Sequence, residues 1–156
     1  MTTGSRTLVA AAVVLAVLAF VLHVRRPHAP AIVADAVRTP GMLNAAVTHA
    51  TIRRTICKRG WTRTVRPPVD YTNALKRKQM RMYDEHGPPS AYQEDHLISL
   101  ELGGDPTDPR NLWPEPYPRA SDVDRIENEL NAEVCGGKLT LAQAQQKESE
   151  LKHNDG

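Results

Sequence analysis

The spacing of apolar residues separates an amino-terminal hydrophobic segment from a longer region of mixed polarity. Leu8 to Leu22 contains no polar residue, and the apolar stretch 8–24 would form a helix about 25 Å long. Because a bilayer has a hydrocarbon core of about 30 Å, residues 1–26 are expected to form a short transmembrane helix or a secretory signal. The proline-rich residues 27–42 show no sustained periodicity and predict a linker.

Three elements are predicted in the region after the linker. Asn44 can cap a short helix that leads to Cys57, and residues 61–65 are expected to be extended before a pair of prolines. Between Asp70 and Tyr83, apolar residues recur on one face at helical spacing. This spacing predicts an amphipathic helix.

The second half of the chain predicts two strands and then two helices. Apolar and polar residues alternate over 98–102, as in a half-buried strand, and residues 111–114 can form a short partner strand. A shortened capping box at Ser121 precedes an apolar helical stripe that ends at Gly136 and Gly137, and a second box at Thr140 begins a last helix. Residues 43–156 are therefore expected to form one α+β domain.

Composition agrees with a single soluble domain and excludes a polytopic membrane protein. The chain has 156 residues, of which 40% are hydrophobic and 24% charged. Its formal charge of +2 conceals an asymmetry, because residues 27–81 carry about +9 and residues 82–156 about −10. A basic half attracts polyanions and an acidic half can hold a divalent cation. Equally, the two halves could fold onto one another and neutralise.

The two cysteines, Cys57 and Cys135, indicate the cell compartment. Neither has the close cysteine or histidine spacing of a zinc site, so we expect a disulfide rather than free thiols. A disulfide favours an exported domain outside the cytoplasmic membrane, either secreted or membrane-anchored. Arg25 and Arg26 conflict with this orientation, because positive charges directly after an apolar segment favour a cytoplasmic location for the residues beyond them.

Asp95 and His96 are the first residues that point to catalysis. Hydrolysis of a phosphodiester needs a group that deprotonates water and a cation that stabilises developing charge. With an ordinary pKa near 6.5, His96 can act as a neutral base at physiological pH. Neighbouring side chains on a regular strand point to opposite faces, so both residues can serve one site only where the strand ends or bends.

The predicted helix after residue 121 supplies further oxygen ligands. Asp124 shares a helical face with Glu127 and with Asn128. Carboxylate and amide oxygens at this spacing can complete a Mg²⁺ or Ca²⁺ site.

Several of these motifs resemble the HNH nuclease family, whose ββα-metal fold places two strands and a helix around one divalent cation. The core of the resemblance is Asp95-His96-Leu97-Ile98, the Gly-Gly turn and Asn111-Leu112. A closer resemblance, over about residues 39–145, is to a group of small bacterial exported HNH-like proteins. It is carried by Thr55-Ile56-Cys57, Val65-Arg66-Pro67-Pro68, Tyr71-Thr72 with Leu75-Lys76, Glu94-Asp95-His96-Leu97-Ile98, Asn111-Leu112-Trp113-Pro114-Glu115 and Glu127-Asn128-Glu129-Leu130.

The resemblance implies short helices flanking a ββα-metal hairpin-helix core, and it assigns roles. His96 would be the general base, Asp95 a metal ligand, and Asn111 the residue that orients the histidine loop. The third ligand would come from the helix, with Asn128 preferred and Asp124 and Glu127 in reserve. Mg²⁺ is the expected ion, with Mn²⁺, Ca²⁺ or Zn²⁺ as alternatives.

The basic residues Arg66, Lys76 and Lys78 are the candidates for contact with a nucleic-acid phosphate backbone. The alternative meaning of the basic run from Lys76 is a solvated helix face.

Three functions are compatible with the sequence. The first is an exported metal-dependent endonuclease that cuts DNA or RNA. It would cut without sequence preference, because none of the motifs belongs to a module that reads bases. The second is a catalytically inactive nuclease-fold domain with a binding or structural role in the cell envelope. The third is an envelope hydrolase that acts on another phosphoester.

Overall fold

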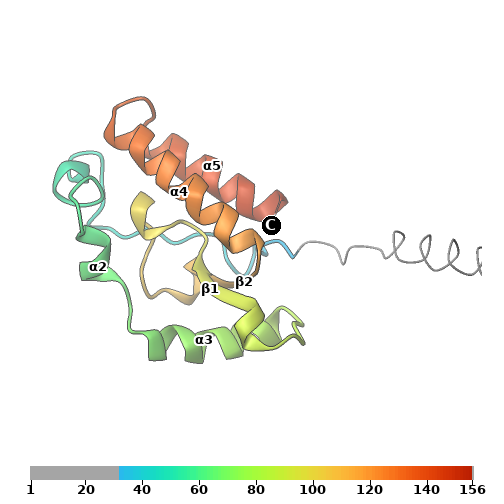
Figure 1. Cartoon of the computed structure of the whole chain (residues 1–156). Coiled ribbons are helices and arrows are strands. Elements are labelled where there is room, and N and C mark those ends of the chain that lie inside the picture. The colour runs from blue at the N-terminus through green and yellow to red at the C-terminus, as the bar shows by residue number, and fades with distance from the viewer. Residues whose placement is uncertain (1–31, 156) are drawn as a thin grey trace, which may run out of the picture. The chain divides into compact units, whose positions relative to one another are not determined.

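The computed structural model describes residues 32–155, which form an α+β domain (Figure 1). The predicted α+β class is confirmed, whereas the apolar segment 1–26 lies outside the described residues. The strands are β1 (Tyr92–His96) and β2 (Leu112–Pro116), and the α-helices are α2 (Trp61–Val65), α3 (Val69–Met82), α4 (Arg119–Cys135) and α5 (Leu141–Asn154). Short 3-10 helices are η1 (Ile52–Arg54), η2 (Pro89–Ala91), η3 (Leu100–Leu102) and η4 (Pro109–Asn111).

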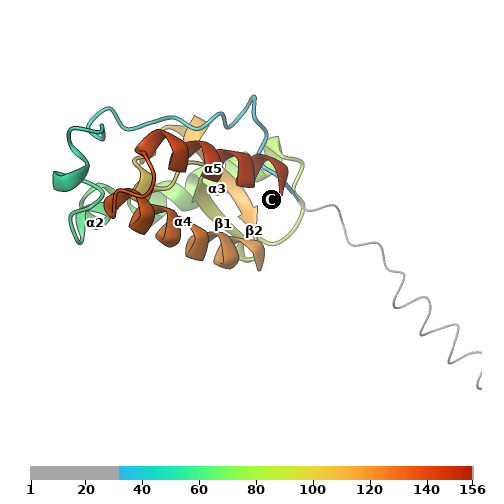
Figure 2. The ribbon, with the colours of Figure 1, turned by 90° about the horizontal axis from the view of Figure 1, so that it is seen from above.

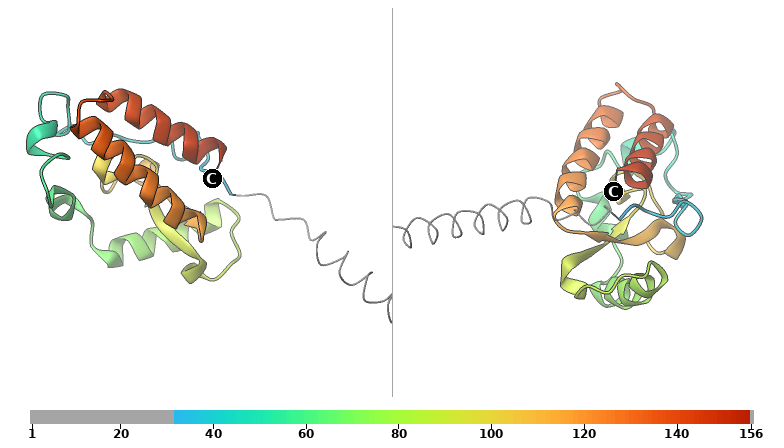
Figure 3. Two further views of the ribbon diagram at one scale, coloured as in Figure 1. Left: turned by 45° about the horizontal axis from the view of Figure 1, so that its top comes forward. Right: turned by 90° about the vertical axis from the view of Figure 1, so that its right-hand side faces the viewer.

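The two strands pair as an antiparallel hairpin between two helical layers. Tyr92 lies opposite Pro116 and His96 opposite Leu112. Helix α3 packs against one side of the hairpin and α4 against the other, while α5 lies beside α4 (Figures 2 and 3). The hairpin is therefore covered on both sides, and the chain passes from β2 directly into α4.

The first strand lies earlier than the alternating pattern predicts. Residues 98–102 form a turn and η3, and β1 ends at His96. Ile98, Ser99 and Leu100 are all buried, so the alternation does not mark a half-exposed strand. The loop folds back on itself because Gly103 adopts a left-handed conformation, with φ of 80°. A Cβ on Gly104 would lie 1.7 Å from the carbonyl oxygen of Ile98, so only glycine fits this turn.

Two further local predictions are wrong. Residues 61–65 form helix α2 rather than an extended segment, because Gly60 is left-handed and directs the chain into a helical turn. The segment after Asn44 forms turns and η1 instead of an α-helix, and the Asn44 side chain accepts a hydrogen bond from the Ala46 amide. Its apolar positions still reach the core, since Val47 and Ile56 are buried there.

The helices on either side of Gly136 and Gly137 agree more closely with the sequence. Helix α4 begins at Arg119, so Ser121 lies inside it and the capping box predicted there is wrong. At α5 the capping box is confirmed, because the Thr140 side chain and the Gln143 side chain each bond the other's backbone amide. Helix α3 occupies the predicted range to within one residue at each end.

Residues 32–42, expected as part of a linker, pack onto the domain. Ala34 is buried with Leu97 and Trp113 in a small apolar cluster. The Ala34 amide also donates to the carbonyl of Lys152 at 2.9 Å, and Thr39 is buried. The amino-terminal end of the described chain is thereby tied to the end of α5.

Cys57 and Cys135 form a disulfide across a sequence separation of 78 residues. The bond joins the segment after η1 to the last residue of α4, beside the larger apolar core. Within residues 32–155, none of the helices has both the length and the apolar character needed to cross a bilayer.

Candidate active site

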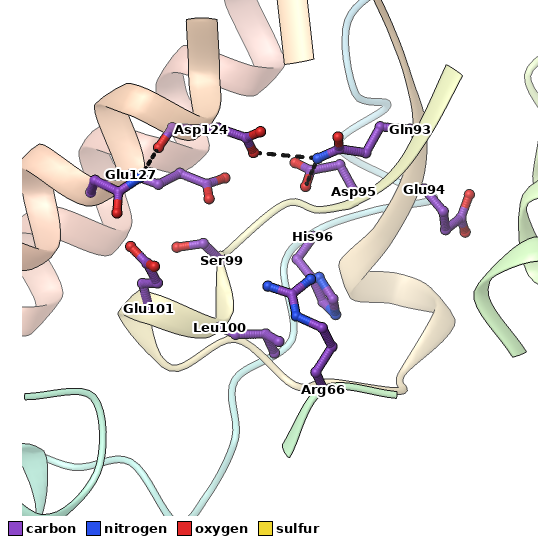
Figure 4. A pocket seen from close by; sticks show the side chains of 11 residues that line it. Arg66, Gln93, Glu94, Asp95, His96, Ser99, Leu100, Glu101, Asp124 and Glu127 are labelled. Carbon is purple, nitrogen blue, oxygen red and sulfur yellow. Dashed lines mark hydrogen bonds between the residues drawn. The ribbon is translucent and has the colours of Figure 1, made fainter. Parts of the chain in front are cut away.

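A cavity of about 390 Å³ opens between β1, the loop after it, α4 and the residue after α2 (Figure 4). Most of its surface comes from polar and charged side chains. The lining residues are Arg66, Gln93, Glu94, Asp95, His96, Ser99, Leu100, Glu101, Asp124, Glu127 and Asn128.

The register of the hairpin explains why carboxylates gather on the side of α4. Gln93 and Asp95 are two residues apart and share a face of β1. Glu115 lies opposite Gln93 across the hairpin, so it belongs to the same face. The Gln93 amide reaches Asp124 on α4 at 3.3 Å, which identifies this face as the one that α4 covers. Figure 4 shows Glu94 pointing away from Asp95.

His96 is the one histidine among the described residues that line the cavity. Its Nε2 lies 3.1 Å from the carbonyl oxygen of Pro106. A carbonyl only accepts, so Nε2 carries the proton and Nδ1 of the neutral ring is left as an acceptor. Burial lowers the pKa of His96 below its usual value, although the neighbouring Asp95 carboxylate opposes the shift. His96 is thus a neutral base at physiological pH.

Asp95 and His96 line the same cavity because β1 ends at His96. A regular continuation of the strand would have kept them on opposite faces. The end of the strand therefore allows both side chains to serve one site.

Asn111 acts on the loop rather than on the cavity. Its side chain is fully buried, accepts from the Ile98 amide at 2.9 Å and donates to the Ile98 carbonyl at 3.0 Å. It also donates to the carbonyl of Asp105. Asp105 precedes Pro106, whose carbonyl accepts from the His96 ring. Asn111 does not line the cavity, and its hydrogen bonds join the two ends of the loop 98–105.

The structure brings Asp95 together with Asp124 and Glu127. Each of these three residues offers a carboxylate oxygen, and the three oxygens lie within 4.8 Å of one another. The Gln93 amide bridges Asp95 and Asp124, at 3.2 and 3.3 Å (Figure 4). Asn128, the preferred third ligand from the sequence, lines the cavity, but its amide nitrogen donates to the backbone carbonyl of Asp124.

A buried lysine reaches the same carboxylates from α5. The Nζ of Lys152 lies 2.7 Å from Asp95, 2.6 Å from Glu127 and 3.3 Å from Glu148, and it also donates to the His96 carbonyl. The Lys152 side chain is 0% exposed. A buried ammonium is stable only when it is paired, and here it has three carboxylate partners.

The charges in this cluster shift one another's protonation. Burial raises the pKa of Asp95, but the ammonium of Lys152 outweighs it and holds that pKa below its usual range. Burial raises the pKa of Glu127 and of Glu148, with Lys152 acting in the opposite direction. Burial lowers the pKa of Lys152, but its carboxylate neighbours raise it by more, so this pKa lies well above normal. Asp95 and Lys152 therefore form an ion pair at neutral pH.

Glu115 is the least satisfied member of the cluster. It is 0% exposed, and neither carboxyl oxygen has a hydrogen-bond partner within residues 32–155. Burial and then the charge of Asp95 raise its pKa to about 8. Glu115 is therefore largely protonated at neutral pH.

This protonation predicts a fall in stability as pH rises. The native Glu115 binds its proton up to about pH 8, whereas the unfolded chain releases it near pH 4.5, so unfolding becomes easier between these values. Burial raises the pKa of Glu94 to about 8 as well, so we expect Glu115→Gln to remove the part of the fall that Glu115 causes, on the order of 3 kcal/mol between pH 5 and pH 8. Urea unfolding at pH 5 and at pH 8, in EDTA, measures the free energy of unfolding of both proteins. The exposed control Glu129→Gln should change neither value, and an unchanged pH dependence in Glu115→Gln would refute the assignment.

The donor set of Asp95, Asp124 and Glu127 fits a hard divalent cation. All three donors are carboxylate oxygens, which suit Mg²⁺, Mn²⁺ or Ca²⁺ better than Zn²⁺. Lys152 bonds one oxygen of Asp95 and one of Glu127, and the Gln93 amide donates to the other oxygen of Asp95, Oδ1. The carboxylate of Asp124 adds further negative charge to the site.

Of the three predicted phosphate contacts, the structure places Arg66 at the cavity. Arg66 is exposed, lines the cavity and acts on His96 through its charge. Lys76 is half-buried on α3 and donates to the carbonyl of Tyr92 at 2.9 Å. Lys78 lines a different cavity, with Arg38 and Tyr83. The basic run on α3 is thus separate from the candidate active site.

The motifs of the sequence did not indicate Lys152, Glu148 or Glu115 as members of the site. A signal for two of them exists in α5, where buried positions recur at 141, 144, 148 and 152. The first two of these residues are apolar, and charged residues then continue the same stripe. Charges in a buried stripe indicate an internal ion pair rather than a solvated face.

No protein-family model, curated protein or solved structure matches this chain. The HNH resemblance therefore stays a prediction that rests on its motifs.

Proposed function

We propose that this protein is a metal-dependent endonuclease of HNH type that hydrolyses phosphodiester bonds without sequence preference. The observation that supports it best is the position of His96, a buried neutral imidazole whose Nε2 is held by Pro106 beside three clustered carboxylates. The order of β1, β2 and α4 along the chain is also the order that an HNH core requires.

In this proposal His96 is the general base. Nδ1 accepts a proton from a water molecule as the water oxygen attacks phosphorus and the ester oxygen leaves. The hydrogen bond from Nε2 to the Pro106 carbonyl fixes the ring and stabilises the imidazolium that forms. Asn111 keeps the loop that carries Pro106 in place through its bonds to Ile98 and Asp105.

Asp95, Asp124 and Glu127 would hold the divalent ion, for which Mg²⁺ is the first candidate, before Mn²⁺ and Ca²⁺. When bound, such an ion stabilises negative charge on the phosphate and on the leaving oxygen. Arg66, which lines the same cavity, would bind a phosphate of the backbone.

Substrate and location are inferred from the same features. Arg66 would contact phosphate and so would carry no sequence information, which makes DNA and RNA both candidate substrates. The disulfide between Cys57 and Cys135 is compatible with export, and we propose an extracytoplasmic domain that is secreted or anchored by residues 8–24.

One observation favours a second candidate, the inactive nuclease-fold domain. The ammonium of Lys152 already pairs with the Asp95 carboxylate and contacts Glu127 without any added ion. A protein that had lost its metal could keep its fold through these pairs and act in the envelope as a binding or structural domain.

A substrate panel separates the candidates. Full-length oxidised protein in mild detergent is incubated with plasmid DNA, structured RNA and a simple phosphomonoester, with Mg²⁺, Mn²⁺, Ca²⁺ or EDTA. The nuclease proposal predicts metal-dependent internal cuts in DNA, RNA or both. Hydrolysis of the monoester alone would support a different phosphoester hydrolase. Nucleic-acid or envelope binding without any hydrolysis would support the inactive domain.

Arg66→Ala tests the phosphate contact. Loss of one exposed phosphate ligand is expected to raise the KM for a DNA duplex about tenfold, with a smaller change in kcat. The slope of the logarithm of the binding constant against the logarithm of the salt concentration should also fall by about one counterion. One positively charged side chain fewer contacts the phosphate backbone. Steady-state cleavage and binding at several salt concentrations measure both effects. Lys78→Ala is the matched control, and an equal effect of the two variants would remove Arg66 from the site.

A further inference from the structure

Lys152 lies at the centre of the carboxylate cluster, and the proposed chemistry does not use it. Its Nζ contacts Asp95 and Glu127, which are two of the three proposed metal ligands, and Glu148 from the same helix. The side chain is 0% exposed and projects from α5, an element that does not line the cavity. Helix α5 thus contributes a side chain to the carboxylate cluster without lining the cavity.

The lysine and a divalent ion would use the same two carboxylates. Lys152 bonds Oδ2 of Asp95 and Oε1 of Glu127, and Oδ1 of Asp95 already accepts from the Gln93 amide, so an ion at these residues would compete with the ammonium for their oxygens. An ion held by Asp95 and Glu127 would be close to the ammonium of Lys152, and the two positive charges would repel. The affinity for the ion is therefore lower than the number of carboxylates alone would give.

Unpartnered oxygens show that the cluster has more carboxyl oxygens than the lysine satisfies. Glu115, fully buried next to Asp95, has no hydrogen-bond partner for either oxygen within the described residues. Glu148 is also fully buried, and its Oε1 accepts from the Ser99 amide and from Lys152, while its Oε2 has no partner there. These oxygens can accept a second cation, or a replacement for the ammonium.

We propose that Lys152 is a positioning residue of the metal site, which holds Asp95 and Glu127 together and keeps a divalent ion weakly bound by occupying one oxygen of each. The inference rests on the proposed function in one respect, because it places the metal at the same carboxylates. Removal of the ammonium should free two ligand oxygens and one buried negative charge, and a divalent ion should then bind more tightly in its place.

The test compares Mn²⁺ binding by wild-type protein and by Lys152→Met, which keeps most of the length of the side chain and removes its charge. Full-length oxidised protein in mild detergent is titrated with Mn²⁺, and free Mn²⁺ is followed by its electron paramagnetic resonance signal. We expect the dissociation constant of Lys152→Met to be at least about tenfold lower than that of the wild type. Lys147→Met, which removes an exposed lysine of the same helix, is the matched control and should bind as the wild type does.

Folding of the variant is measured in parallel by circular dichroism with and without Mn²⁺. If Lys152→Met is unfolded alone, the proposal predicts that Mn²⁺ restores its helical signal, whereas Lys147→Met is folded in both conditions. A folded variant with wild-type Mn²⁺ affinity, or an unfolded variant that Mn²⁺ does not rescue, would overturn the proposal.

Cleavage is recorded separately, so that the two claims fail independently. If neither protein cuts nucleic acid but Lys152→Met binds Mn²⁺ more tightly, the proposed nuclease function fails and the role of Lys152 stands. If the wild type cuts nucleic acid and both proteins bind Mn²⁺ equally, the nuclease stands and the role of Lys152 is refuted.

Discussion

Replacing His96 by alanine is expected to reduce the rate of phosphodiester cleavage by about 10²- to 10⁴-fold, the contribution typical of a positioned general base. The imidazole lines the cavity, and no other histidine among its described lining residues could take over. The methyl group of alanine leaves Asp95, Asp124 and Glu127 in place, so metal binding should persist while the rate falls.

The pH dependence of the wild-type rate gives an independent check on His96. Burial lowers the pKa of this imidazole below 6.5, so the neutral form persists to lower pH than in an exposed histidine. The midpoint of the decline in rate as pH falls should therefore lie below pH 6.5. Initial rates between pH 5 and 8 measure this limb, and His96→Ala should lack it.

His49→Ala is the matched control, because His49 is exposed and lines cavities remote from His96. Its rate and pH profile should equal those of the wild type. A folded His96→Ala protein that cuts at the wild-type rate would remove His96 from catalysis.

Loss of the Cys57–Cys135 disulfide is expected to lower the free energy of unfolding by about 4 to 5 kcal/mol. The bond spans 78 residues, and closing a loop of this length restricts the unfolded chain more than the folded one. It also holds the segment after η1 to the end of α4, where Ile56 and Val134 belong to the same core. For a domain of this size, such a loss is a large fraction of total stability.

Guanidinium unfolding of the double variant Cys57→Ser, Cys135→Ser measures the effect against oxidised wild type. Thiol labelling of the denatured wild type without reductant should detect no free thiol. The variant Ser149→Ala, which changes a half-buried serine of α5, serves as a control for small polar substitutions. Equal unfolding midpoints for the double variant and the wild type would contradict the expected role of the bond.

Much of the helical structure could be predicted from periodicity, because α3, α4 and α5 each bury one face. The strands were harder to predict, because β1 has the sequence Tyr-Gln-Glu-Asp-His and shows no alternation of apolar and polar residues. Asp95 and His96 at its end are buried because helices cover both sides of the hairpin and Asp95 pairs there with Lys152. The apolar alternation at 98–102 marks a buried loop instead.

The part of the candidate site that the hairpin brings together was predictable from the sequence. Asp95 and His96 are adjacent in sequence, and Asn111 lies in the turn that leads into β2, so a hairpin is enough to bring them together. Lys152 lies 57 residues beyond Asp95, and only the packing of α5 on α4 brings it to the cluster. The carboxyl-terminal tail, which lies beyond the HNH-like motifs, therefore contributes to the site.

The central claim is tested most directly by metal add-back in a cleavage assay. Full-length oxidised wild type and His96→Ala are incubated with supercoiled plasmid and RNA in Mg²⁺, Mn²⁺ or Ca²⁺, then in EDTA, and then with the ion restored. The proposed function predicts that the wild type cuts with a divalent ion, stops in EDTA and resumes on restoration, while His96→Ala cuts at least about 100-fold more slowly than the wild type when an ion is present. Absence of cutting by folded, disulfide-bonded wild type with all three ions would contradict it.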